Sequence, residues 1–338
     1  MISNIKILLI SILSISNFSC LSENRSTEDA ITNKNRPNIL ILLTDDQSFN
    51  TINALGNKEI STPNIDKLVS NGFTFTHAYI MGSFSGAVCM PSRAMLMTGQ
   101  YLQKLDKVQG AIGENIKTMP QLLKESGYTT FFTGKWHNRK ASFFKSFTNG
   151  ENIFMGGMSN HLKVPLYNFD PSGIYPEKNK FFKDKFSSVL FKEAAVNFLR
   201  QYDGIKPFFA CVSFTSPHDP RMAPEDYQKK YNTEAISLPK NFMSKHNFNN
   251  GELIIRDENL LPFPRTKSDV KGEIASYYAM ISEVDFNIGE ILNELKKNKF
   301  YDDTIIIFTS DNGLAVGQHG LLGKQNIYDH SVRVPLII

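Results

Sequence analysis

Residues 38–44 read NILILLT, a nearly continuous apolar run, and the carboxylates Asp45 and Asp46 follow it directly. A strand with one face in water alternates between apolar and polar residues. An uninterrupted apolar run is instead typical of a parallel strand that is covered on both faces. We therefore expect residues 38–44 to form a buried strand, with Asp45 and Asp46 at its carboxyl end.

Strands and helices alternate along the rest of the chain. The pattern predicts strands at 128–133, 207–214 and 304–309 and helices at 63–70, 119–125, 187–202 and 272–297. Apolar residues from Ile274 to Leu295 recur at intervals of three and four, so this face of the last helix is expected to pack in the core. Such alternation predicts an α/β fold: a mixed, mostly parallel central sheet flanked by helices on both faces.

Composition narrows the class of protein. The chain has 338 residues, of which 41% are hydrophobic, and this is enough for one large core. The formal net charge of +4 is small and dispersed, so nucleic acid is not an expected partner. The three cysteines, Cys20, Cys89 and Cys211, cannot form a disulfide framework, and their spacing does not resemble a zinc site.

Residues 1–20 resemble an export signal, in which Lys6 precedes an apolar run, 7–15, that is too short to span a bilayer. A small residue before Cys20 resembles a bacterial lipoprotein cleavage site, and plain secretion is the alternative. Residues 21–36 are polar and lack periodicity, which is typical of a linker. We expect a periplasmic protein, an outer-membrane lipoprotein or a secreted protein, with membrane contact only through a lipid anchor at Cys20.

Polar residues follow three of the predicted strands. Asp45 and Asp46 end the first strand, His218 follows the strand at 207–214, and Asp311 and Asn312 follow the strand at 304–309. Ligands bind at the carboxyl ends of parallel strands. Adjacent buried carboxylates repel each other unless a cation compensates, and this all-oxygen set suits Ca²⁺, with Mg²⁺ as an alternative. Each residue alone could be an ordinary turn residue.

A lone cysteine stands in the sequence CMPSR at residues 89–93. Pro91 is typical of the first turn of a helix, where unpaired N–H groups carry partial positive charge. We therefore expect an anion site here and expect a thiolate at Cys89 to be favoured. The alternative is that Cys89 is a small core residue.

These features together resemble the sulfatase family of the alkaline phosphatase superfamily, of the type whose active-site cysteine is converted to formylglycine. The family's Cys-x-Pro-Ser-Arg signature, closing with Thr-Gly, matches residues 89–93 and 98–99. Other positions that match the family are Asp45, Asp46, Lys135, His137, His218, Asp311, Asn312 and Lys324. The resemblance extends over residues 37–338, and its motifs are weak singly but specific together.

The resemblance implies a sulfuric ester hydrolase in which a maturing enzyme converts Cys89 to formylglycine. The implied metal ligands are Asp45, Asp46, Cys89, Asp311 and Asn312. The implied catalytic residues are Cys89, Arg93, Lys135, His137, His218 and Lys324, of which Lys135, His218 and Lys324 also bind the substrate. In the implied mechanism His218, with Lys324, protonates the departing alcohol, and His137 takes a proton from the hydrated formylglycine to expel sulfate. Without the signature, these lysines and histidines would be read as ordinary loop or packing residues.

Loops at 138–184 and 241–266 are expected to form the walls of the substrate pocket. Their aromatic and basic residues suit a sulfated carbohydrate, whereas choline sulfate or a simple aryl sulfate is the alternative. Two other functions stay open: a phosphodiesterase or phosphonate hydrolase of the same superfamily, and an inactive binder of sulfated glycans.

The chain ends on the sequence RVPLII at residues 333–338, the pattern of a buried strand. Members of the family usually continue into a smaller carboxy-terminal lobe with an antiparallel sheet. We therefore expect residues 37–338 to be the catalytic domain, truncated at its carboxyl end, with the C-terminal lobe missing.

Overall fold

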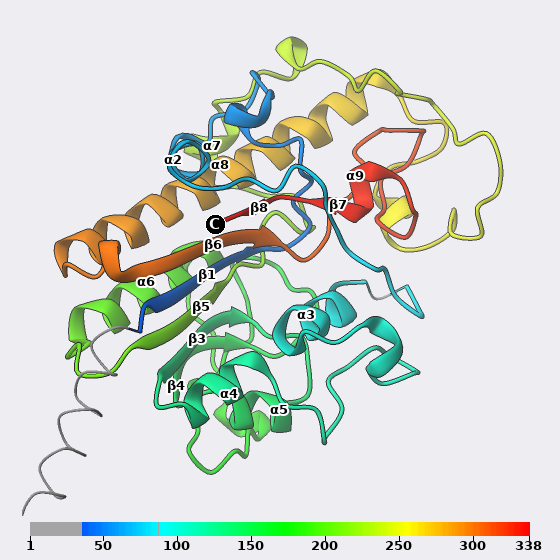
Figure 1. The fold of residues 1–338 in the computed structure, drawn as a ribbon. Helices are drawn as coiled ribbons and strands as arrows, with labels where there is room; N and C mark the ends of the chain where they lie inside the picture. The colour runs from blue at the N-terminus through cyan, green and yellow to red at the C-terminus, as the bar shows by residue number, and fades with distance from the viewer. Residues whose placement is uncertain (1–35, 87) are drawn as a thin grey trace, which may run out of the picture. The chain divides into compact units, whose positions relative to one another are not determined.

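A six-stranded sheet runs through residues 38–338 (Figure 1). The computed structural model describes residues 36–86 and 88–338, so the predicted export signal, the lipid anchor at Cys20 and nearly all of the linker lie outside the described residues. In spatial order the strands are β4 (Asn149–Phe154), β3 (Thr129–Lys135), β5 (Phe208–Ser213), β1 (Asn38–Thr44), β6 (Thr304–Ser310) and β8 (Leu336–Ile337). All neighbours pair in parallel except β8, which runs antiparallel to β6. The predicted mixed, mostly parallel sheet is confirmed.

Helices cover both faces of this sheet (Figure 1). The α-helices of the described residues are α2 (Pro63–Asn71), α3 (Cys89–Thr98), α4 (Met119–Glu125), α5 (Lys140–Ser146), α6 (Ser187–Gln201), α7 (Glu225–Gln228), α8 (Lys267–Lys297) and α9 (Asp329–Val332). Leu40 and Leu42 of β1 pack with α6 and α8, whereas Ile41 and Leu43 pack with α3 on the opposite face. Because successive side chains of a strand point to opposite faces, burial on both faces explains why β1 is apolar at almost every position.

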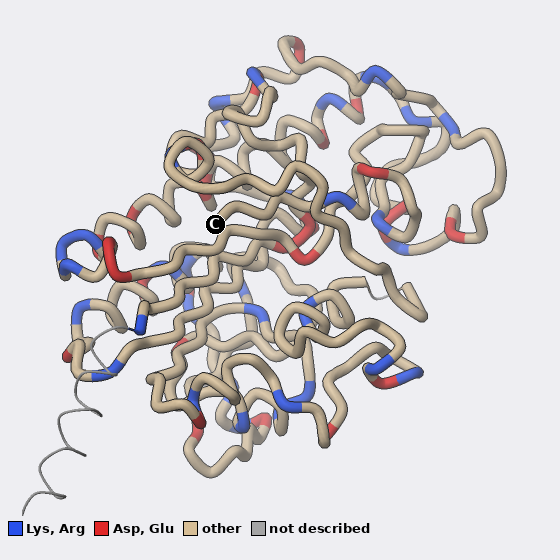
Figure 2. The backbone as a smooth tube through the Cα atoms, in the orientation of Figure 1, with Lys and Arg blue, Asp and Glu red and all other residues tan. Residues whose placement is uncertain are grey.

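Short elements complete the described fold. Strands β2 (Ala78–Tyr79) and β7 (Arg333–Val334) pair antiparallel. The 3₁₀ helices are η1 (Asn53–Leu55), η2 (Leu102–Lys104), η3 (Glu177–Asn179), η4 (Thr233–Ala235), η5 (Asp257–Leu260) and η6 (Tyr301–Asp303). Among the residues described here, no helix is both long and apolar enough to cross a membrane. Acidic and basic residues are interspersed along the backbone (Figure 2), in keeping with the small net charge.

Most predicted elements end within two residues of their predicted bounds, but the region 138–184, predicted as a loop, contains α5 and β4. Three other differences have a clear local cause or consequence. Helix α8 begins five residues before Gly272, because the side chain of Thr266 accepts a hydrogen bond from the backbone of Asp269 and caps the first turn. Helix α3 begins at Cys89, two residues before Pro91. The predicted carboxy-terminal strand is instead two short strands, β7 and β8, on either side of Pro335.

Candidate active site

The carboxyl ends of four neighbouring strands bring most of the predicted site residues together. Asp45 and Asp46 follow β1, and Asp311 follows β6, with which β1 is in parallel register. The backbone N–H of Asp46 donates to a carboxylate oxygen of Asp311 at 3.0 Å, which joins the two strand ends. Lys135 is the last residue of β3, and His218 lies in the loop after β5. Residues far apart in sequence therefore meet at one edge of the sheet.

Three buried carboxylates are paired with three buried cations at this edge. The Lys135 Nζ lies 2.6 Å from Asp45, the Arg93 Nε lies 2.8 Å from Asp311, and the Lys324 Nζ lies 2.7 Å from Asp46. None of these six residues is more than 6% exposed. With three negative and three positive side chains, the cluster is formally neutral. Because a buried charge is costly unless it is paired, the loss of any one of these side chains would leave its partner as an unpaired buried charge.

Burial and the neighbouring charges together shift the pKa values of two carboxyl groups of this cluster, Asp46 and Asp311, in opposite directions. Burial raises the pKa of Asp46, but the positive charge of Lys324, together with His218 and Lys135, brings it well below its usual value. Burial, reinforced by the negative charge of Asp45, raises the pKa of Asp311 to about 6. Asp46 is therefore firmly ionised, whereas Asp311 ionises less readily.

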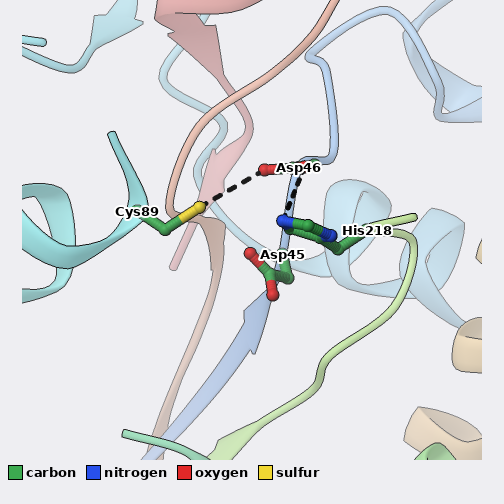
Figure 3. Close-up of side chains that lie close together, drawn as sticks. All are labelled: Asp45, Asp46, Cys89 and His218. Atoms are coloured by element: carbon green, nitrogen blue, oxygen red, sulfur yellow. Dashed lines mark hydrogen bonds and ion pairs between the residues drawn. The ribbon is translucent and has the colours of Figure 1, made fainter. Parts of the chain in front are cut away.

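Cys89 lies in the first turn of α3, and its side chain points to Asp46 (Figure 3). Its Sγ is 3.6 Å from the nearer Asp46 carboxylate oxygen and 3.1 Å from the Lys324 Nζ. Burial raises the pKa of the thiol well above its usual value, and the charge of Asp311 adds to this effect. The sequence prediction that a thiolate would be favoured is wrong, because α3 begins at Cys89 and places the thiol inside the protein rather than at an exposed helix end.

The donor set fits a divalent cation. Ligand atoms of Asp45, Asp46, Cys89 and His218 lie within 4.8 Å of one another, and Figure 3 shows these four side chains converging. The Oδ1 atoms of Asp45 and Asn312 are buried and accept no hydrogen bond. A buried oxygen without a donor costs free energy, and a bound cation removes that cost. Asp311 is close by, although its two oxygens already accept hydrogen bonds from Asp46 and Arg93.

Two histidines lie beside this cluster, and both are neutral at pH 7. Burial lowers the pKa of His218 to about 4, and the charge of Lys324 lowers it further. Its Nε2 lies 3.7 Å from Asp46, and its Nδ1 lies 2.8 Å from the carbonyl of Asp219. Burial, with the charges of Lys135 and Arg93, lowers the pKa of His137 to about 2. The Nδ1 of His137 is buried without a hydrogen-bond partner.

A cavity of about 380 Å³ opens above these residues. Its lining includes Cys89, His137, His218 and Lys324. Both regions predicted to form its walls contribute: Gly157 and Met158 come from the loop after β4, and Ile255, Arg256 and Asp257 come from the second region. Of the buried charge cluster, Lys324 lines this open pocket, beside Cys89.

A model of the sulfatase family matches residues 37–338. The chain belongs to the sulfatase family. The resemblance inferred from the Cys89 signature and the strand-end residues is therefore confirmed.

Relatives of this sulfatase-family chain are longer than it is. It is 27% identical to the N-acetylglucosamine-6-O-sulfatase of Bacteroides thetaiotaomicron, in a match that covers 99% of this chain and 67% of the relative. It is 28% identical to human iduronate 2-sulfatase, over 94% of this chain and 60% of the relative. Among solved structures, a putative sulfatase from Bacteroides fragilis superposes with a TM-score of 0.73 at 25% identity, covering 89% of this chain and 67% of that one.

Three supporting residues of this sulfatase site were not found from the sequence. Tyr277 was assigned to core packing alone, but its hydroxyl also donates to the backbone carbonyl of Asp46 at 2.6 Å. The Nε2 of His161 lies 2.9 Å from the backbone carbonyl of His218. Glu258 accepts hydrogen bonds from the backbone just before Lys324. The stripe on α8 signalled Tyr277 only as an apolar position, and no motif marks the other two.

Proposed function

We propose that this protein is an enzyme that hydrolyses sulfate monoesters, with a sulfated carbohydrate as substrate. The observation that carries the proposal is the position of Cys89, which lies in the family's signature and on the floor of a pocket. There it contacts both Lys324 and Asp46. The two relatives described above are named for acting on sulfated sugars, which supports a carbohydrate substrate.

Two groups complete the proposed site. Conversion of Cys89 to formylglycine by a maturing enzyme supplies a hydrated aldehyde, with one hydroxyl as nucleophile and a second whose deprotonation releases sulfate. A divalent cation, Ca²⁺ in preference to Mg²⁺, supplies positive charge for the sulfate group. Its proposed ligands are Asp45, Asp46, residue 89, Asp311 and Asn312, a set that includes the two buried oxygens that accept no hydrogen bond.

The cationic side chains have different proposed roles. Lys324 lines the pocket, and Lys135 lies behind it, paired with Asp45; both are proposed to bind the sulfate oxygens. Arg93 donates to the Asp311 carboxylate at 2.8 Å and to the Lys135 carbonyl at 2.7 Å. Because its guanidinium is committed to these partners, Arg93 holds the site's framework and does not move protons.

Proton transfer is assigned to the residues that line the pocket. His218, with Lys324, donates a proton to the departing alcohol oxygen, and the negative charge of a bound sulfate ester favours the protonated form of His218. His137 lines the pocket and is neutral, and its Nδ1 accepts no hydrogen bond from the protein, so that nitrogen is available to accept a proton. It accepts that proton from the second hydroxyl at residue 89.

Export and maturation belong to the same proposal. Residues 1–20 are proposed as the export signal, with lipidation at Cys20 or plain secretion as alternatives, and residues 21–36 as the linker. A formylglycine-generating enzyme is the proposed maturation partner. Residues 37–338 are proposed as the catalytic domain.

Mass spectrometry of the peptide around Cys89, after co-expression with a formylglycine-generating enzyme, is the first test. Conversion of the thiol to an aldehyde, followed by sulfate release from sugar sulfates, is the expected result, and Cys89→Ala is the control. Turnover of phosphonate monoesters or phosphodiesters without sulfate release would instead identify the related hydrolase. Glycan binding by an unconverted protein, under conditions that convert a known sulfatase, would identify an inactive binder.

A further inference from the structure

Three consecutive charged residues, Arg256, Asp257 and Glu258, stand at the start of η5, before α8. Arg256 and Asp257 line the pocket, and Glu258 is buried behind them. Arg256 forms a two-pronged ion pair with the carboxylate of Asp219, and its Nη2 lies 3.0 Å from the Asp219 Oδ1. That same oxygen lies 3.2 Å from the His218 Nδ1. A planar guanidinium that grips a carboxylate fixes its orientation. Arg256 therefore holds the carboxylate that flanks the His218 ring.

Glu258 makes a corresponding connection to the loop that carries Lys324. Its carboxylate accepts hydrogen bonds from the backbone N–H groups of Leu322 at 2.9 Å and Gly323 at 2.8 Å. Arg265 neutralises it at 2.7 Å, and both charged residues are only 2% exposed. The backbone immediately before Lys324 is thus tied to a buried ion pair.

Asp257 links the same run to the side of the pocket that carries Cys89. Its Oδ2 accepts a hydrogen bond from the side-chain amide of Gln325 at 3.1 Å. The same amide nitrogen donates to the carbonyl of Gly86 at 3.0 Å, three residues before Cys89. Gln325 directly follows Lys324, so Asp257 and Glu258 restrain the chain on both sides of that lysine.

Charge distinguishes this arrangement from a subsite for a second anionic group of the substrate. Arg256 is at the rim, and its side chain is 47% exposed. However, it is paired with two carboxylates, Asp219 and Asp257, each only 9% exposed. Arg256 and its two carboxylate partners together carry a formal net charge of −1, so they do not attract an anion.

We propose that residues 256–258 form a brace that positions both His218 and Lys324, the two groups assigned to protonate the leaving alcohol. Arg256 acts through Asp219, while Asp257 and Glu258 act through the loop around Lys324. They are positioning residues, and their role rests on the function proposed above. The brace thereby sets how well the enzyme expels a poor leaving group.

The test compares two leaving groups in the variants Arg256→Gln and Gln325→Ala, prepared in the formylglycine form. Nitrophenolate departs without a proton, whereas phenolate is a poorer leaving group that gains from protonation. We expect kcat for phenyl sulfate to fall about tenfold or more, and kcat for 4-nitrophenyl sulfate to fall less than about threefold, because general acids contribute about 10²–10⁴-fold. Arg256→Lys, which keeps the charge but not the two-pronged contact, should be intermediate.

The matched control is Arg200→Gln. Arg200 forms a similar two-pronged ion pair with the largely buried Glu294, far from the pocket on α6 and α8, and it should leave both rates unchanged. Equal losses on the two substrates in Arg256→Gln and Gln325→Ala would overturn the brace and indicate general structural damage. A rise in KM alone would overturn it in favour of substrate binding. Failure of the unaltered enzyme to release sulfate from either ester would refute the proposed function itself.

Discussion

Replacing Glu283 with glutamine should stabilise the protein at alkaline pH and have little effect at acid pH. Glu283 lies on α8 and is 1% exposed. Its Oε1 accepts a hydrogen bond from Asn287 at 2.6 Å, and its titratable neighbours include Lys192 and Tyr227. Burial raises its pKa from 4.5 to about 7. A glutamine keeps the contact with Asn287 and has no charge to bury.

The size of the effect follows from proton linkage. The folded state binds the proton more tightly than the unfolded state, so folding is favoured below pH 4.5, and stability is lost as the pH rises from there to about 7. With about 1.4 kcal/mol per pKa unit, the loss is about 1 kcal/mol at pH 5 and about 3 kcal/mol at pH 8. The difference in free energy of unfolding between Glu283→Gln and the unaltered protein should therefore shift by about 2 kcal/mol in favour of the variant from pH 5 to pH 8.

Urea unfolding of both proteins at several pH values between 5 and 8 measures this difference. Glu294→Gln, on the same helix, is the control. Hydrogen bonding to Arg200 lowers the pKa of Glu294, so this carboxyl is ionised in both the folded and the unfolded protein from pH 6 to 8. The effect of Glu294→Gln on the free energy of unfolding should therefore be constant over that range. A Glu283→Gln effect that is equally independent of pH would refute the argument from burial.

Three further predictions concern the site itself. Cys89→Ser should accept one sulfate group per molecule and then stop, because a serine ester lacks the second hydroxyl that expels sulfate; continued turnover would contradict the formylglycine proposal. Tyr277→Phe should weaken Ca²⁺ binding, measured by calorimetry, by about tenfold, since it removes a hydrogen bond that orients Asp46. Arg93→Gln should destabilise the metal-free protein by about 3 kcal/mol, because Asp311 loses its buried partner. Added Ca²⁺ should restore part of that loss, and an unchanged unfolding midpoint in chelator would contradict the prediction.

The local sequence was sufficient to predict an element of the fold or of the site where a single physical cause determines that element. The apolar run of β1 is buried on both faces, so its pattern alone identified both the strand and the class of sheet. The residues after parallel strands share one edge, which allowed Asp45 and Asp311 to be placed together without a structure. The Cys89 signature then identified the family.

The remaining features depend on distant parts of the chain. Burial and the charge of Asp311, which lies more than 200 residues later in the chain, raise the pKa of the Cys89 thiol. Arg256 and Glu258 act through ordinary hydrogen bonds from a loop without a motif, so nothing in their local sequence distinguishes them from solvated charges. The start of α8 depended on a single capping side chain, that of Thr266.

The strand order also determines when the site can form during synthesis. Strand β1 is made early, but its partners β5 and β6 begin at residues 208 and 304. Lys324, whose Nζ lies 3.1 Å from the Cys89 Sγ, is made later still. Because such long-range pairings form late, a growing chain leaves β1 unpaired and the Cys89 thiol accessible until most of the domain has been made. An enzyme that must grip the extended peptide around this thiol has its access within that interval, because folding then leaves Cys89 only 3% exposed, on the floor of the pocket.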